Sequence, residues 1–241
     1  PHTTRRRQRQ MCIRDSHGSF TVESSQKSGD EPFGKKTDQP DPDTELFSFT
    51  FNGPIIEDKL FFSLGYEKYE ASDPLSLLGF QSGSVTKAEA DAVIKAATDV
   101  IGYDAGTYNK AREEEDEKTF LRLDANLSEN HNLTFSYNLT EGFTESAYFN
   151  RTWGLPLSSN WYRINKEYES MKLELNSNWT DNFSTKILIS DTDVSNPNTP
   201  VGATTIGEVG IRVASGGTVF FGPDQYSCLL YTSPSPRDMP R

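Results

Sequence analysis

Apolar and polar residues alternate with a period of two in three parts of the chain, and this pattern predicts β-strands with one apolar face. In the first part the apolar face consists of Phe47, Phe49, Phe51, Leu60, Phe62, Leu64 and Tyr66. The intervening residues 53–59 include Pro54, which has no backbone N–H to donate. We therefore expect the first strand to end before Pro54 and the next to begin near Leu60.

The same alternation predicts two further hairpins, with short polar turns at residues 128–131 and 180–182. The apolar face of the second hairpin consists of Leu121, Leu123, Ala125, Leu127, Leu133, Phe135, Tyr137 and Leu139. That of the third consists of Met171, Leu173, Leu175, Trp179, Ile187 and Ile189, although Leu188 interrupts the polar face. Each strand is expected to run about nine or ten residues, close to the ~9–11 that a tilted membrane-spanning strand needs.

The connections between these hairpins, at residues 71–118 and 142–167, are long, whereas the turns within them are short. Compact soluble domains rarely have long loops, but outer-membrane barrels combine short periplasmic turns with long extracellular loops. Aromatic residues at predicted strand ends suit the interfacial girdles of such barrels, namely Tyr66, Tyr69, Tyr137, Trp179 and Phe183. We predict an all-β fold, an antiparallel up-and-down transmembrane β-barrel fragment that is incomplete. A soluble antiparallel sandwich, which gives the same alternation, is the alternative.

One long connection contains a helix signal. Thr86 and Glu89 have the spacing of a capping box, in which the two side chains satisfy backbone N–H groups at a helix start. Apolar residues then recur at helical spacing: Ala88, Ala92, Val93, Ala96 and Val100. We expect one short helix near residues 86–101, within an extracellular loop.

Both cysteines lie near the ends of the chain, in MCIRDS (residues 11–16) and CLLYTS (residues 228–233). One DNA sequence can encode the first, and its reverse complement, shifted in frame, encodes the second. The repeat resembles the inverted end of a transposase-type sequencing adapter. We therefore interpret residues 1–16 and 228–241 as adapter-derived, non-native sequence, and residues 17–227 as a truncated reading frame.

Setting these ends aside changes the charge of the chain. They contain seven of the 24 Lys and Arg residues and two of the 35 Asp and Glu residues, so the net charge falls from −11 to about −16. A strongly acidic chain excludes nucleic acid as an expected partner, because phosphates require Lys and Arg. No apolar run approaches the ~18 residues of a membrane helix.

The sequence predicts no catalytic, cofactor-binding or metal-binding residues, and we do not expect an enzyme. The acidic run Glu113 to Glu117 lacks the glycine turn and ligand spacing of a calcium loop, so we interpret it as a solvated stretch. Residues 191–198 read as a loop. His131 lies in a turn with no second His or Cys nearby, which argues against a metal site.

Four segments resemble Oar-like TonB-dependent outer-membrane receptors, in the order that this family has them. They are GPIIEDKLFFSLGYEKYE (Gly53 to Glu70), FLRLDANLSENHNLTFSYNLTEG (Phe120 to Gly142), LELNSNWTDNFSTKILI (Leu173 to Ile189) and GTVFFGPDQYS (Gly217 to Ser227). The resemblance implies a longer parent, with an N-terminal plug inside a barrel of about 22 strands. Residues 17–227 would then be part of the N-terminal region of that barrel.

The resemblance further implies energised uptake of an unidentified ligand across the outer membrane of a Gram-negative bacterium. The expected partners are outer-membrane lipid, the extracellular ligand and the TonB-ExbB-ExbD system, which would act through the missing plug. Cofactors are not expected. Two alternatives stay open: a non-transporting outer-membrane adhesin or structural barrel, and a soluble secreted β-sandwich binding module.

Overall fold

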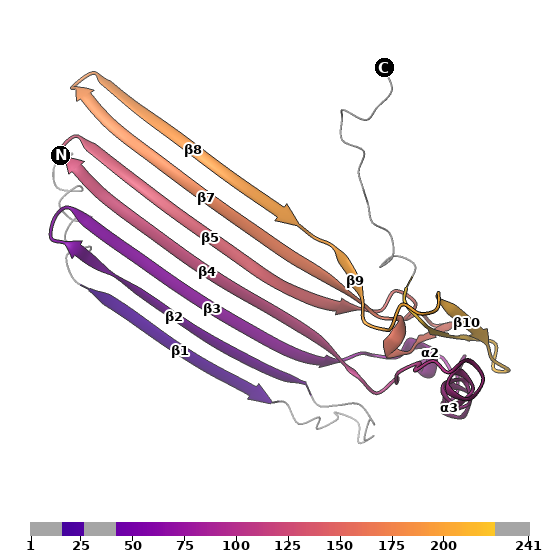
Figure 1. The fold of residues 1–241 in the computed structure, drawn as a ribbon. Helices are drawn as coiled ribbons and strands as arrows, with labels where there is room; N and C mark the ends of the chain where they lie inside the picture. Colours follow the sequence, from indigo (N-terminus) through magenta and orange to yellow (C-terminus); the bar gives the residue numbers. More distant parts are fainter. Residues whose placement is uncertain (1–15, 27–41, 225–241) are drawn as a thin grey trace, which may run out of the picture.

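The structure, a computed structural model, describes residues 16–26 and 42–224. Most of these residues form one large antiparallel sheet, and a smaller module lies at one end of it (Figure 1). The predicted adapter-derived ends, residues 1–16 and 228–241 with both cysteines, lie outside the described residues except for Ser16. The described part of the chain is therefore mostly antiparallel β-structure, as the alternation predicted.

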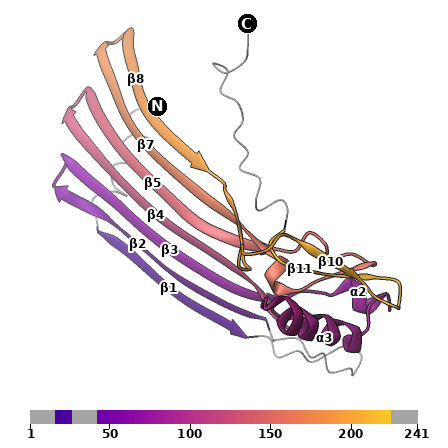
Figure 2. The ribbon, with the colours of Figure 1, turned by 45° about the vertical axis from the view of Figure 1, so that its right-hand side comes forward.

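The large sheet is a meander in which strands adjacent in sequence are hydrogen-bonded neighbours, in the order β1-β2-β3-β4-β5-β7-β8. Its strands are β1 (His17–Gln26), β2 (Asp43–Ile56), β3 (Leu60–Pro74), β4 (Ala111–Ser128), β5 (His131–Ser146), β7 (Tyr162–Thr180) and β8 (Phe183–Ser195). A short strand, β9 (Asn198–Pro200), pairs with the start of β7. Among the described residues the sheet is open, with β1 and β8 at its two edges, and its strands bend together along their length (Figure 2).

The three predicted hairpins, β2–β3, β4–β5 and β7–β8, are confirmed, but their strands are longer than predicted. They contain 13 to 19 residues each, not nine or ten. Ladder pairing continues beyond the apolar positions, because backbone groups pair whatever the side chains are. The connections therefore shorten to residues 75–110 and 147–161, and Asp191–Ser195 belongs to β8 and not to a loop.

The expected strand end before Pro54 is wrong. Strand β2 continues to Ile56, and Pro54 is paired with Phe61 of β3, just before a register shift. Pro54 thus lies next to a bulge or irregularity in the ladder, which is a place in a sheet where a residue without an N–H is tolerated.

Strand β1 was not predicted from the sequence. It pairs with β2 over its whole length and places Phe20 opposite Phe49. The alternation in this segment includes only two large apolar residues, Phe20 and Val22, which is too short a pattern to indicate a strand by itself.

The smaller module, here called the cap, is built from residues 75–110, 147–161 and 201–224. Its elements are α2 (Leu78–Gln81), α3 (Lys87–Ala96), η1 (Ala97–Ile101), β6 (Gly154–Pro156), η2 (Ser158–Asn160), β10 (Val209–Arg212) and β11 (Thr218–Phe221). Strand β11 is antiparallel to β10 and parallel to β6, and it pairs with both. The connections that read as separate loops thus fold together on the end of the sheet opposite the short turns (Figure 1).

The cap contains the hydrophobic core of the described chain. Twelve buried residues form it: Leu77, Val85, Ala90, Val93, Ala97, Tyr103, Ala105, Tyr108, Leu155, Leu157, Val219 and Phe221. Trp161, also fully buried, lies where the cap joins β7, and its indole N–H donates to the carbonyl of Pro156. Sequence alternation indicated only the sheet, because the core residues of the cap come from three distant segments.

The helix expected near residues 86–101 is confirmed as α3 followed by the π-helical turn η1. Thr86 and Glu89 form the capping box, since each side chain bonds to the backbone N–H of the other. The helix ends at Gly102, whose positive φ of 71° closes the last turn and suits glycine.

Candidate functional site

Strand register brings the predicted apolar positions, except Leu127 at the register shift near the end of β4, onto one face of the sheet as a continuous surface, here called the apolar band. It crosses all seven long strands, because Phe20 lies opposite Phe49, Leu64 opposite Leu121, and Leu173 opposite Ile189. Its members are Phe20, Val22, Phe47, Phe49, Phe51, Leu60, Phe62, Leu64, Tyr66, Leu121, Leu123, Ala125, Leu133, Phe135, Tyr137, Leu139, Met171, Leu173, Leu175, Trp179, Ile187 and Ile189.

Many side chains of the apolar band are exposed. Phe20 is 68% exposed and Ile189 65%, at opposite edges of the sheet, and Phe51 and Met171 between them are about half exposed. Cross-strand aromatic pairs, such as Phe20 with Phe47 and Phe49 with Tyr66, pack the band laterally but do not cover it. An exposed apolar surface of this extent marks a site of interaction with another molecule or with lipid.

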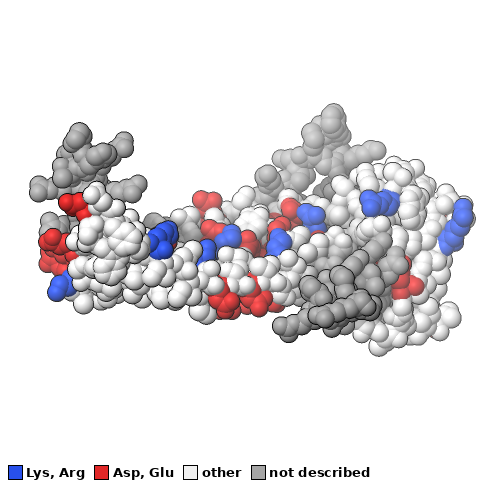
Figure 3. Space-filling view, turned by 90° about the horizontal axis from the view of Figure 1, so that it is seen from above, with Lys and Arg blue, Asp and Glu red and all other residues white. Residues whose placement is uncertain are grey.

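The opposite face of the sheet is mainly polar. Its charged side chains pair across and along strands: Arg122 with Asp124 at 2.7 Å, Lys118 with Glu67 at 2.9 Å, and Lys186 with Glu174 at 2.8 Å. Hydroxyl groups fill the positions between them, and Thr134 donates to Asp124. In Figure 3, charged side chains gather in patches along the sheet and leave wide areas without charge. The sheet thus has one face suited to an apolar environment and one suited to water.

On the same face of the sheet as the apolar band, but nearer the cap, the strands carry acidic residues in place of apolar ones. Glu117 lies opposite Glu141, which lies opposite Glu167, and Asp193 follows on β8. Lys68 offsets part of this charge through ion pairs with Glu70 at 2.7 Å and Glu115 at 3.8 Å. The apolar band therefore has a sharp boundary on the side of the cap.

Of the predicted girdle residues, Trp179 and Phe183 lie beside the short turn of the β7–β8 hairpin, as expected. Tyr66 and Tyr137 lie in the middle of their strands, next to the acidic boundary, because the strands continue beyond the band. Tyr69 lies on the polar face, opposite Leu46 and Asp116, so its assignment to a girdle was wrong. Aromatic residues nevertheless lie at both borders of the band.

The acidic run Glu113 to Glu117, interpreted above as a solvated stretch, lies in β4, and its side chains are partly exposed. Its carboxylates are held by ion pairs and hydrogen bonds, for example Glu113 with Arg163 at 2.9 Å. His131 begins β5, and its ring contacts Trp179 at 4.9 Å between centroids. Within residues 16–26 and 42–224, no group of three His, Cys, Asp or Glu side chains could hold a metal ion.

A buried carboxylate, which sequence reasoning missed, fastens the cap to the sheet. Glu145, at 0% exposure near the end of β5, accepts from Lys110 at 2.9 Å and from Arg163 at 3.2 Å. Its second oxygen accepts from the backbone N–H of Glu113 at 3.2 Å. Arg163 also stacks over the ring of Phe143 at 4.1 Å. The cluster joins the start of β4, the end of β5 and the start of β7, which no local pattern could indicate.

No family model matches the chain, and neither the curated proteins nor the solved structures include a match to it. Among the described residues, no helix combines the length and the apolar character needed to span a bilayer.

Proposed function

We propose that residues 17–227 form part of the wall of a TonB-dependent outer-membrane receptor, with the apolar band facing lipid. The observation that supports this most is the continuity of the band across seven strands, on an exposed face. In a membrane barrel, strands alternate between lipid and a polar interior, which matches the two faces of this sheet.

The height of the apolar band fits a bilayer. On β7 the band extends from Met171 to Trp179, nine residues, whereas the strand itself has 19. A tilted strand crosses the hydrocarbon layer in about 9–11 residues. The remaining residues of β7 would rise above the membrane, where the acidic boundary and the cap lie.

The proposal also orients the chain. In outer-membrane barrels the short turns are periplasmic and the long connections extracellular. The cap, formed by the long connections, would then lie outside the cell and contribute to capture of an unidentified ligand. The polar face would line the barrel interior, and TonB-ExbB-ExbD would act through the plug of a longer parent protein.

The exposed band argues against a soluble β-sandwich, because a sandwich covers the apolar face of one sheet with a second sheet. The second sheet described here, β10-β11-β6, lies in the cap at the end of the large sheet (Figure 2).

An adhesin or structural barrel would have the same apolar band. A plug domain encoded upstream in the parent gene favours the receptor, and a gene without one favours the adhesin or structural barrel.

The membrane orientation can be measured with spin labels. Cys12 and Cys228 are replaced by serine, and single cysteines are placed at four consecutive positions of β5, Leu133, Thr134, Phe135 and Ser136. The labelled chain is refolded in detergent and transferred to phospholipid vesicles. We expect labels at Leu133 and Phe135 to be accessible to oxygen, which concentrates in lipid. Labels at Thr134 and Ser136 should instead be accessible to a water-soluble nickel chelate.

The neighbouring positions serve as controls for each other, since they differ in face and hardly in depth. Labels at Leu133 and Phe135 that are shielded from both reagents would indicate a covered face, as in a sandwich, and would contradict the proposal. Equal accessibility to the nickel chelate at all four positions would contradict it as well.

A further inference from the structure

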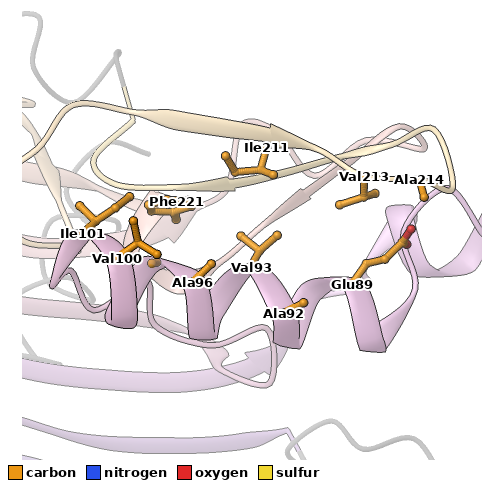
Figure 4. Close-up of a pocket in the computed structure, with 11 residues that line it drawn as sticks. Glu89, Ala92, Val93, Ala96, Val100, Ile101, Ile211, Val213, Ala214 and Phe221 are labelled. Carbon is orange, nitrogen blue, oxygen red and sulfur yellow. The ribbon is translucent and has the colours of Figure 1, made fainter.

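The cap contains an apolar pocket of about 480 Å³ between the helix α3–η1 and the β10–β11 hairpin. Figure 4 shows side chains of the helix pointing toward Ile211 and Val213 on the facing strand segment. Its lining consists of Glu89, Ala92, Val93, Ala96, Ala97, Val100, Ile101, Ile211, Val213, Ala214 and Phe221. The volume lies within the ~300–1,000 Å³ of small-molecule sites in proteins.

The mouth of the pocket is open and apolar. Val100 is 83% exposed, and Ile101 and Ile211 beside it are about half exposed. The stripe that indicated a helix in the sequence, including Ala92, Ala96 and Val100, faces this pocket. Ala90 is buried in the core of the cap, and Ala97 belongs to both the core and the pocket lining. The helix thus has a second apolar face, which the described residues leave uncovered.

The single charged residue of the lining, Glu89, is bonded to groups of the cap itself. Glu89 Oε1 accepts from the backbone N–H of Ser215 at 2.9 Å. Oε2 accepts from the N–H and hydroxyl of Thr86 and from the hydroxyl of Ser215, at 2.8 to 2.9 Å. The carboxylate therefore accepts four hydrogen bonds from the cap, three of them on Oε2, and these bonds hold its position. The other lining residues are Ala, Val, Ile and Phe, and an anionic or strongly polar ligand would lose its hydration among them without compensation.

We propose that this pocket binds a small, uncharged, apolar molecule. Its volume limits the size of the ligand, and its lining of Ala, Val, Ile and Phe side chains sets the chemistry. The proposal goes beyond the receptor function and does not depend on it, since the pocket lies entirely within the cap and uses neither face of the large sheet.

Photolabelling of the full chain in detergent micelles tests the proposal, with an uncharged alkyl diazirine as the probe and mass spectrometry to locate the labelled residues. We expect saturable labelling of peptides from α3 and β10, which excess parent hydrocarbon without the diazirine abolishes. Labelling of the apolar band through the micelle is expected to rise without saturation, so the two events are separated within one sample.

A matched pair of substitutions in α3 localises the site. Ala96→Trp fills the pocket, and Ala88→Trp places the same side chain at an exposed position of the helix outside the lining. We expect A96W to lose the saturable labelling and A88W to keep it. If labelling of α3 in the unsubstituted chain does not saturate, the proposal is overturned, and this result does not depend on whether A96W folds. Saturable labelling that persists unchanged in A96W overturns it as well. Either result would indicate that the groove is a packing surface and not a ligand site.

Discussion

At the scale of single residues, the buried carboxylate of Glu145 decides how the cap is held on the sheet. It accepts hydrogen bonds from Lys110, which precedes β4, and from Arg163 of β7. Glu113 supplies a second negative charge to the same two cations. Removal of one partner of a buried ion pair leaves the other charge uncompensated and is strongly destabilising. Substitution of Glu145 should therefore lower stability far more than substitution of the exposed acidic residues around it.

We expect Glu145→Gln to destabilise the junction by roughly 2–3 kcal/mol, less than the ~3–5 of a fully buried pair, because Lys110 and Arg163 keep contact with water. Hydrogen exchange of the chain in detergent measures this as faster exchange in the cap and in the adjoining strand ends. The control is Glu141→Gln, an exposed position of the same strand, for which we expect a change within about 0.5 kcal/mol. Equal effects of the two substitutions would contradict the role of Glu145.

The pKa of Glu89 provides a second test at this scale. Hydrogen bonds from the backbone N–H of Thr86 above all, and from Ser215, lower the pKa of this carboxyl from 4.5 to about 2. Because the folded pKa lies below the ordinary value, the stabilisation by Glu89 is complete above pH 4.5 and is lost as the pH falls toward 2.

Glu89→Gln should therefore loosen the contact between α3 and the Ser215 turn at pH 7, and this difference from the unsubstituted chain should shrink between pH 4.5 and 2. Protection of the Ser215 amide against hydrogen exchange, corrected for intrinsic rates at each pH, follows the contact. A carbon NMR titration of the Glu89 carboxyl gives its pKa directly, and a midpoint near 4.5 would refute the assignment.

At the scale of elements, each long strand has two faces with different tolerance for charge. Phe135 belongs to the apolar band, and the next residue, Ser136, lies opposite Arg122 on the polar face. Both residues are paired on two sides within the same ladder, so their backbone environments are closely similar.

We expect Phe135→Arg to weaken assembly of the chain into vesicles by about 2–4 kcal/mol, the penalty for arginine on a lipid face near the bilayer midplane. Ser136→Arg should assemble nearly as well as the unsubstituted chain. The fraction that stays with vesicles after a urea wash measures the difference. If S136R is the more damaging of the two, the polar face and not the band faces lipid.

At the scale of the whole molecule, we expect behaviour in solution to follow from the exposed band and from the sheet edges at β1 and β8, which the described part of the chain leaves unpaired. Unpaired edges and a large apolar surface both promote association. We expect the full chain to aggregate in plain buffer and to disperse in detergent, as judged by light scattering. A sharp, cooperative thermal transition of a monomer in plain buffer would contradict the membrane proposal.

The sequence by itself determined the three hairpins, their short turns, the faces of their strands and the helix after Thr86. These features are local, because a period of two and a capping box are set by residues a few positions apart. The strand end expected before Pro54 was wrong, because β2 continues to Ile56 past a register shift.

Only the tertiary structure decided where the connections go. The cap core joins Leu77, Leu155 and Val219 from three segments, and Glu145 meets Lys110 and Arg163 across strands. Tertiary structure also decided how far the strands extend, since ladder pairing continues through acidic residues that interrupt the apolar pattern. Such contacts depend on chain segments brought together by the sheet, and no short stretch of sequence encodes them.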